Sequence, residues 1–365
     1  MRKSIASIGA ALLLAASFSA EVAAQQQFRW KLQSANPAGT PHMELLTKLA
    51  GNIDRMSGGR LKIEILPSGA IIAPFEILDG VNKGIVEMGQ WWTHYATGKH
   101  PAGGLFSAPI GGAGSGLDQM NHLSWYMRGG GRELYLEYYQ KILKRDVMAF
   151  LYAPDGPEAF GWVKKPPKSV AEYTKLRFRM SSGLPSDVLK DMGGVPMNLA
   201  GAELIPAAER GLIDGVEWIN PANDLKVGLH DVFKFYSLQG LHQAIDIADV
   251  IINGEKWRSL PPDLQAIVQT AMTTSIFEAM LYFVDENAKA LQEIKKKGVT
   301  MYDAPPDYAP AFIKSAKKVL AKFEAQDPFF KRVLESQRKF AAVVVPYTKE
   351  TNKLTQLIAG AAEGQ

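Results

Sequence analysis

Hydrophobic and polar positions along the first part of the chain predict strands and helices in turn. Apolar residues occupy every second position at 28–32 and at 61–65, as in half-buried strands. Between these strands they fall at helical spacing over 45–56, and a short helical stretch at 75–82 leads to a third strand at 86–88. A β-α-β-α-β series predicts a parallel sheet with right-handed crossovers.

A second unit of the same kind follows. Its predicted elements are strands at 148–152, 161–163 and 177–180, helices at 186–192 and 202–210, and a strand at 215–219. Two α/β units in one chain predict two lobes with a cleft between them.

One predicted helix is much longer than the others. Pro261-Pro262 opens a helical pattern that ends near Lys297, before Gly298. About 36 residues at 1.5 Å rise give ~54 Å, so we expect this helix to run along both lobes. Two helices that break near 273–275 are the alternative. A last helical region is predicted over 328–344, where Pro346 interrupts it before it resumes to about 362.

Composition and charge exclude several classes of function. The 365 residues are 47% hydrophobic and 21% charged, as in a globular protein rather than a disordered one. The formal net charge of +4 is spread along the chain, which argues against nucleic acid as a partner. Because the sequence has no cysteine, thiol nucleophiles and thiolate metal sites are excluded.

The first 24 residues have the form of a secretory signal peptide. Arg2 and Lys3 precede an apolar run over 5–16, and Val22-Ala23-Ala24 forms a cleavage site of the expected kind. We therefore expect cleavage after Ala24 and a periplasmic protein. An uncleaved membrane anchor is the alternative, although the apolar run is shorter than the ~20 residues that a bilayer span needs.

Motifs for catalysis and phosphate binding are weak in this sequence. It contains no Gly-x-x-x-x-Gly-Lys-Ser/Thr, His-Glu-x-x-His or Gly-x-Ser-x-Gly segment. None of its six histidines form a tight ligand pair on a helix face, which argues against a zinc site. The sequence therefore makes no positive case for an enzyme.

Polar residues gather instead at the predicted ends of strands, where α/β proteins bind ligands. A buried arginine suits a bidentate hold on a carboxylate. Two glutamates near a main-chain carbonyl suit a hard cation, Na⁺ or Ca²⁺. The residues at these strand ends are Glu158, Arg179, Glu217 with Trp218, and His242 with Gln243.

Seven short motifs are specific when their order and spacing are taken together. They are Ser-Gly-Gly-Arg-Leu-Lys-Ile at 57–63, Pro-Ser-Gly at 67–69, Glu-Met-Gly at 87–89, Gly-Lys-His-Pro-Ala at 98–102, Gly-Gly-Gly at 129–131, Glu-Leu-Ile-Pro-Ala at 203–207 and Gly-Leu-Ile-Asp-Gly-Val-Glu-Trp at 211–218. On these motifs nearly all of the mature chain resembles the solute-binding proteins of tripartite ATP-independent periplasmic (TRAP) transporters. Within that family it resembles the subfamily that binds 2-oxo monocarboxylates such as pyruvate, or the related lactate.

The resemblance implies an α/β, two-lobed periplasmic binding protein fold with a ligand cleft between the lobes and a long helix spanning both. It implies a homodimer through an exchanged C-terminal helix, with packing of that helix on its own lobe as the alternative. The implied division of the chain is a signal peptide at 1–24, lobe I at 25–153 with about 243–275, lobe II at 154–242 with about 276–327, and a C-terminal helical segment at 328–365.

The resemblance also implies a function without chemistry: the protein captures a small carboxylate and delivers it to a membrane permease. Arg179 matches the arginine that pairs with the ligand carboxylate, and Tyr95 matches a tyrosine that contacts the ligand. The Glu217 side chain and the Trp218 main-chain carbonyl match ligands of a cation, Na⁺ or Ca²⁺, that is shared with the bound carboxylate.

Two positions depart from the subfamily pattern as we align it. Glu158 stands where glutamine is usual, and Gln243 stands where glutamate is usual. If both contact the cation and the ligand, the carboxylate has moved from one position to the other and the charge of the site is kept.

The sequence leaves several alternatives open. Trp91, Trp92 and Phe160 either line the pocket, which would favour a larger oxo acid, or belong to the core. A sugar acid or a dicarboxylate is an alternative ligand, and a secreted metal-dependent enzyme is the alternative class.

Overall fold

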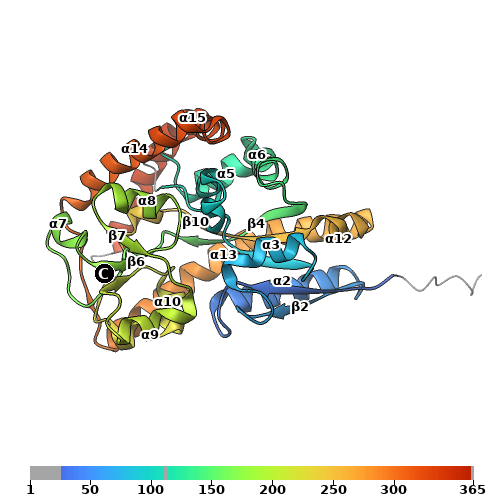
Figure 1. Cartoon of the computed structure of the whole chain (residues 1–365), viewed down its shortest axis with the longest axis horizontal. Helices are drawn as coiled ribbons and strands as arrows, with labels where there is room; N and C mark the ends of the chain where they lie inside the picture. Colours follow the sequence, from blue (N-terminus) through green and yellow to red (C-terminus); the bar gives the residue numbers. More distant parts are fainter. Residues whose placement is uncertain (1–25, 111–113, 363–365) are drawn as a thin grey trace, which may run out of the picture.

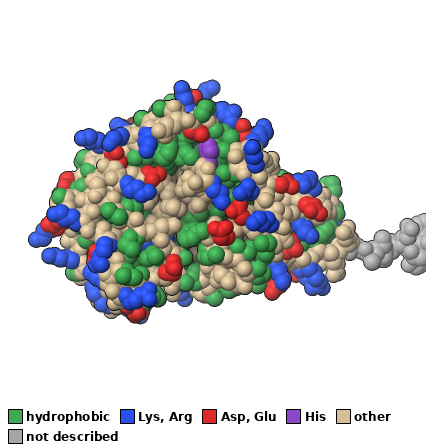
Figure 2. Space-filling view, viewed as in Figure 1, with side chains coloured by type: hydrophobic (Ala, Val, Ile, Leu, Met, Phe, Trp, Pro, Cys, Tyr) green, Lys and Arg blue, Asp and Glu red, His purple; other side chains and the backbone are tan. Residues whose placement is uncertain are grey.

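The computed structural model describes residues 26–110 and 114–362, so the expected signal peptide at 1–24 lies outside the described residues. Within these ranges the strands form a five-stranded and a six-stranded sheet, each covered by helices (Figure 1). We call the parts built around these sheets the first and the second lobe. Acidic and basic side chains are interspersed on the face in Figure 2.

The sheet of the first lobe combines parallel and antiparallel strands. Strand β1 pairs with β2 and β3 in parallel, as the sequence predicts, whereas β10 runs antiparallel to β3 and β4. The third strand begins at Met88 rather than at 86, because the chain is still in a turn after Gly84. In spatial order the strands are β2 (Leu61–Leu66), β1 (Phe28–Ser34), β3 (Met88–Trp91), β10 (Asp246–Asn253) and β4 (Val147–Gly156).

The sheet of the second lobe is built from shorter strands. The strand predicted at 215–219 contains only Gly215–Val216, because the chain leaves the sheet there and Ala159 N donates to Ile219 O. Glu217 keeps one main-chain bond to β6, from its N to Arg179 O, and Trp218 follows it beyond the end of the strand. In spatial order the strands are β11 (Thr300–Met301), β9 (Phe235–Ser237), β5 (Gly161–Val163), β8 (Gly215–Val216), β6 (Arg177–Arg179) and β7 (Val195–Met197).

Helices cover both sheets and join them. The α-helices are α2 (Pro41–Met56), α3 (Ile77–Asn82), α4 (Gly104–Ser107), α5 (Gln119–Arg128), α6 (Gly131–Glu137), α7 (Val170–Tyr173), α8 (Leu184–Asp191), α9 (Leu204–Glu209), α10 (Pro221–Val227), α11 (Leu229–Val232), α12 (Gly254–Ser259), α13 (Pro262–Lys296), α14 (Tyr308–Gln326) and α15 (Pro328–Ala362). Single turns of other helix types are η1 (Pro74–Glu76), η2 (Thr93–Gly98), η3 (Pro101–Gly103), η4 (Tyr138–Ile142), η5 (Gly201–Glu203) and η6 (Leu241–Gln243).

The long helix α13 is continuous over 35 residues, so the alternative of a break near 273–275 is wrong. The hydroxyl groups in this region are satisfied inside the structure: Thr273 Oγ1 donates to Gln269 O, and Ser275 Oγ makes bonds to Met272 O and Tyr152 O. Helix α13 packs on α2 and β4 in the first lobe and on α10 in the second. It therefore connects the two lobes.

The C-terminal helix α15 is also continuous, so the expected interruption at Pro346 is wrong. A proline inside a helix removes one hydrogen bond and crowds the preceding turn. Here the next turn is exposed, and the Thr348 hydroxyl donates to Val344 O or Val345 O beside the proline. The first half of α15 is anchored by buried Phe330 and by Gln337, which donates to Leu105 O, whereas the second half is exposed.

Candidate ligand and cation site

A small cavity lies where the chain crosses between the two sheets. It encloses about 230 Å³ of unfilled space, and both lobes contribute to its lining. The structure therefore brings together polar residues that are up to about 150 positions apart in the sequence. The lining residues are Trp92, His94, Tyr95, Glu158, Arg179, Ser181, Trp218, Ile219, Gln243 and Asp246.

A buried ion pair forms one wall of this cavity. Arg179 ends β6, and Glu217 follows β8 on the neighbouring strand. Arg179 Nη1 donates to Glu217 Oε1 at 2.8 Å and to Glu217 O at 2.9 Å, and Nε donates to Leu199 O at 3.1 Å. The Ser181 amide donates to the same Oε1 at 2.6 Å, and the guanidinium lies 5.0 Å from the Trp218 ring centroid. The arginine and the glutamate are therefore both fixed in position.

Several buried polar atoms beside this pair have no hydrogen-bond partner among the described residues. They are Glu158 Oε2, Glu217 Oε2, Gln243 Oε1 and both ring nitrogens of His242. Glu158, Glu217 and His242 each offer one atom within 4.8 Å of the others. Unsatisfied buried acceptors are costly, and a set rich in oxygen is what a hard cation requires. The residues thus fit Na⁺ or Ca²⁺.

Protonation follows from burial in this cluster. Burial raises the pKa of Glu158 well above its usual range, and the neighbouring Glu217 carboxylate raises it further. Burial lowers the pKa of His242 to about 4, so its ring is neutral at pH 7 and can accept a cation. His242 Nε2 lies 3.4 Å from Glu158 Oε2.

The cavity also presents groups that suit an anion. The indole N–H groups of Trp92 and Trp218 have no partner within the described part of the chain. Burial raises the pKa of the Tyr95 hydroxyl, so this group keeps its proton at neutral pH. Of the three aromatic residues left open by the sequence, Trp92 lines the cavity. Trp91 donates to Tyr139 OH in the core, and Phe160 packs on Tyr173 and Tyr308.

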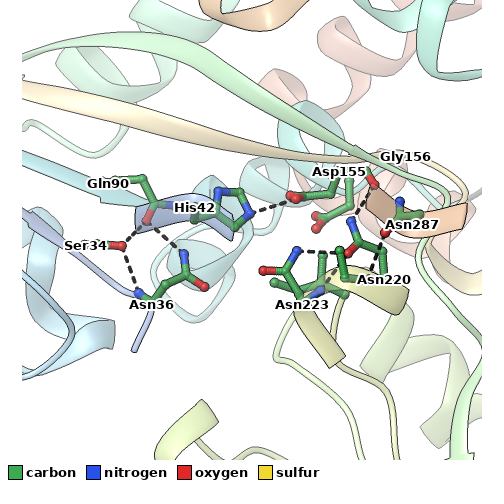
Figure 3. Close-up of polar contacts among 12 residues, drawn as sticks. Ser34, Asn36, His42, Gln90, Asp155, Gly156, Asn220, Asn223 and Asn287 are labelled. Carbon is green, nitrogen blue, oxygen red and sulfur yellow. Dashed lines mark hydrogen bonds and ion pairs between the residues drawn. The ribbon is translucent and has the colours of Figure 1, made fainter. Parts of the chain in front are cut away.

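Polar contacts behind the cavity connect the two lobes (Figure 3). His42 Nε2, on α2, lies 2.7 Å from Asp155 Oδ1 at the end of β4. Asn220, which caps α10 in the second lobe, donates from Nδ2 to Asp155 O at 2.9 Å. Figure 3 shows the His42 ring and the Asn220 amide approaching the Asp155 segment from different elements.

The structure adds residues that sequence reasoning did not assign to the site. His242 was noted only beside Gln243, and His94, Ser181 and Asp246 were not assigned. The signal for Asp246 is a carboxylate inside a mostly apolar segment, which also holds Asp249. The signal for Ser181 is its place just after the strand that ends at Arg179. Nothing in the local sequence marks His94, because its place in the cavity depends on how distant strands meet.

Two lobes around a cavity with a buried arginine and unsatisfied oxygens define a binding protein for a small anionic solute. Residues 32–327 match the family model described as bacterial extracellular solute-binding protein, family 7, and the chain belongs to this family. Its members are solute-binding proteins of TRAP transporters, which act outside the cytoplasm together with a membrane permease.

Three relatives show how far the similarity extends. A monocarboxylate 2-oxoacid-binding periplasmic protein of Nostoc sp. (strain PCC 7120) is 28% identical over 323 residues, covering 88% of this chain and 86% of that protein. A TRAP solute-binding protein from Pseudoalteromonas atlantica T6c, solved with sodium and pyruvate, is 27% identical with a TM-score of 0.84, covering 91% of this chain and 99% of that one. One from Colwellia psychrerythraea, solved with calcium and pyruvate, is 27% identical with a TM-score of 0.83 and the same coverage.

Removing one member of the buried ion pair should destabilise the fold. We expect Glu217→Ala in metal-free buffer to lower the free energy of unfolding by about 3–5 kcal/mol, because it leaves the Arg179 charge buried and unpaired. Asp214→Ala is a matched control, since it removes the partner of exposed Arg177 on the same strand. Urea unfolding, followed by tryptophan fluorescence, measures the free energy of unfolding of the two variants. If both variants lose the same amount of stability, the buried pair does not have this role.

Proposed function

We propose that this protein captures a small 2-oxo monocarboxylate such as pyruvate, together with Na⁺ or Ca²⁺, and delivers it to a TRAP permease. The observation that carries the proposal is the set of unsatisfied oxygens of Glu158, Glu217 and Gln243 beside buried Arg179. The pyruvate-bound relatives with sodium or calcium support it.

Arg179 would hold the ligand carboxylate through one nitrogen. A guanidinium has five N–H groups, and the recorded bonds of Arg179 use the one on Nε and the two on Nη1. This leaves the two N–H groups of Nη2 for the ligand. The indole N–H of Trp92 and the Tyr95 hydroxyl are further donors for ligand oxygens.

The cation would bind to the unsatisfied oxygens of the cavity. The Glu158 and Glu217 side chains, the Gln243 amide oxygen and the Trp218 main-chain carbonyl are the proposed ligands, with the His242 ring as a further candidate. The cation supplies positive charge that balances the two glutamates and the ligand carboxylate, for which Arg179 alone does not suffice.

The charge of the lining favours a monocarboxylate over a dicarboxylate. Arg179 is the one lysine or arginine among the described lining residues, whereas a second cationic side chain would favour a dicarboxylate. A sugar acid, which also carries one carboxylate, is distinguished by the ligand panel below.

Calorimetry tests the proposed ligand. We expect mature protein to bind pyruvate with micromolar affinity, about −8 kcal/mol, in the presence of Ca²⁺ or Na⁺. In sodium-free buffer with chelator the binding should weaken by about tenfold or more. Lactate, longer 2-oxo acids, a sugar acid and succinate form the comparison panel, and NMR of the recovered ligand checks that it is unchanged. Preferred binding of succinate or of the sugar acid, binding that ignores cations, or turnover would contradict the proposal.

Cation binding should release a proton from Glu158. Because its pKa is raised in the free protein and a cation takes only the ionised carboxylate, affinity for the cation should rise with pH until Glu158 is ionised. In Glu158→Gln we expect weaker cation binding and loss of the proton release, measured by calorimetry in buffers of different ionisation enthalpy. Glu64→Gln, at an exposed position on β2, is the control. Unchanged binding in Glu158→Gln would remove this residue from the site.

We also propose a homodimer through the C-terminal helix. The C-terminal part of α15 exposes several large apolar side chains. A helix that faces only water does not need them, and such a patch is typical of a surface that binds another protein. They are Val343, Tyr347, Leu354, Leu357 and Ile358, each at least 60% exposed.

Light scattering after gel filtration measures this assembly. We expect the full chain to be a dimer and Leu354→Asp/Ile358→Asp to be monomeric with an unchanged affinity for the ligand. Lys349→Asp, which adds a charge change on the same helix outside the apolar set, is the control and should stay dimeric. A monomeric full chain would contradict the proposal.

A further inference from the structure

A glutamine that binds a cation must be held in one orientation. The end of its side chain carries one oxygen and one NH₂ group of almost the same size, and only the oxygen can coordinate a cation. A rotation of the amide by half a turn would direct two positive hydrogens at the cation instead. A glutamate at the same position has oxygens on both sides and needs no such control.

Asp246 provides this control for Gln243. Gln243 Nε2 donates to Asp246 Oδ1 at 3.1 Å, and Gln243 Oε1 is buried without a partner among the described residues. Both side chains are buried, at 1% and 2% exposure, so water does not compete for the amide. The hydrogen bond therefore determines which atom of the amide is left free.

We propose that Asp246 is a positioning residue that orients the Gln243 amide so that its oxygen, and not its nitrogen, faces the cation. This inference rests on the proposed function and extends it to a residue outside the expected ligand set. Groups that hold the ligands of a metal typically change metal affinity by about 10- to 100-fold when they are removed.

A role for Asp246 as an additional negative charge is the competing explanation. Burial and the neighbouring Asp155 carboxyl raise the pKa of Asp246 well above its usual range. The positioning role requires residue 246 to have an oxygen that accepts a hydrogen bond from Gln243, but it does not require this residue to be charged. An asparagine at this position has an oxygen for Gln243 and an NH₂ group that can donate to Asp155.

Three single variants and one double variant distinguish these roles. Calcium affinity in the presence of saturating pyruvate, measured by calorimetry, is the first readout, and the shift of the melting temperature by Ca²⁺ is the second. We expect Asp246→Ala to weaken Ca²⁺ binding by about 10- to 100-fold and Asp246→Asn to stay within about threefold of the unmutated protein. If Asp246→Ala does not fold, Asp246→Leu fills the volume without accepting a hydrogen bond.

The effect should disappear when position 243 is glutamate. In the Gln243→Glu background, Asp246→Ala should leave Ca²⁺ affinity within about threefold, because a glutamate needs no control of its orientation. The double variant should in turn bind more tightly than Asp246→Ala alone, because Glu offers an oxygen in either orientation. A residue that matters only for packing would lower affinity in both backgrounds.

Each outcome has a defined meaning. Equal losses in Asp246→Asn and Asp246→Ala would show that the charge of Asp246 matters rather than its position. An equal loss of Ca²⁺ affinity on Asp246→Ala with glutamine and with glutamate at position 243 would overturn the inference. Unchanged Ca²⁺ affinity in Asp246→Ala would overturn it as well. If the unmutated protein binds pyruvate without any cation, the proposed function fails first, and that result is recognised before any variant is compared.

Discussion

The buried pair of Arg179 and Glu217 is the interaction on which the site depends. Moving two charges out of water costs several kcal/mol per ion, so such a pair adds little net stability. The pair is tolerated in the interior because both charged groups are hydrogen-bonded. Glu217 Oε1 accepts from Arg179 and from the Ser181 amide, and Leu199 O accepts from the guanidinium. What the pair provides is geometry, because it fixes both side chains and leaves Nη2 of the arginine and Oε2 of the glutamate without a bond to each other.

The charge of the cavity is unbalanced without its ligands. Glu158, Glu217 and Asp246 are carboxylic acids, Arg179 is a cation, and the buried rings of His94 and His242 are neutral at pH 7 because burial lowers their pKa values to about 3 and about 4. In the free protein, burial raises the pKa values of Glu158 and Asp246, so protons on these two residues reduce this imbalance. Under the proposed function, a cation and a carboxylate that enter together would replace those protons, so the solute would be recognised as an ion pair rather than as an anion alone.

Local patterns in the sequence predicted the parts of the fold that local forces determine. The long helix α13 follows from its opening prolines, its apolar spacing and Gly298, and the parallel strands β1 to β3 follow from the β-α-β series. The antiparallel direction of β10 could not be predicted, because apolar alternation is the same in either direction. The expectation at Pro346 failed because the carbonyl that loses its helical donor there, on Ala342, is on an exposed residue and can bond to water instead.

The same distinction holds for the site. Strand ends indicated where Arg179 and Glu217 lie, since side chains that follow adjacent parallel strands meet at one edge. The sequence could not indicate that His94 and Asp246 join them, because these contacts depend on how the two lobes meet. Ser181, two residues after Arg179, lies at the same strand end and its contact with Glu217 is made within the second lobe. Asp246 in particular occupies a position in β10 where the apolar pattern predicts a core residue.

Glu158 and Gln243 show why a site is better described by its network than by single positions. The Glu158 amide donates to Gln243 O at 3.0 Å, so the main chain holds the two residues next to each other. Under the proposed function, a carboxylate could therefore stand on either residue and still lie beside the same cation. The exchange is not neutral, however, because it converts a symmetric ligand at position 243 into one that has a right and a wrong orientation. The site then requires an acceptor for the amide nitrogen, and Asp246 is placed where that acceptor is needed.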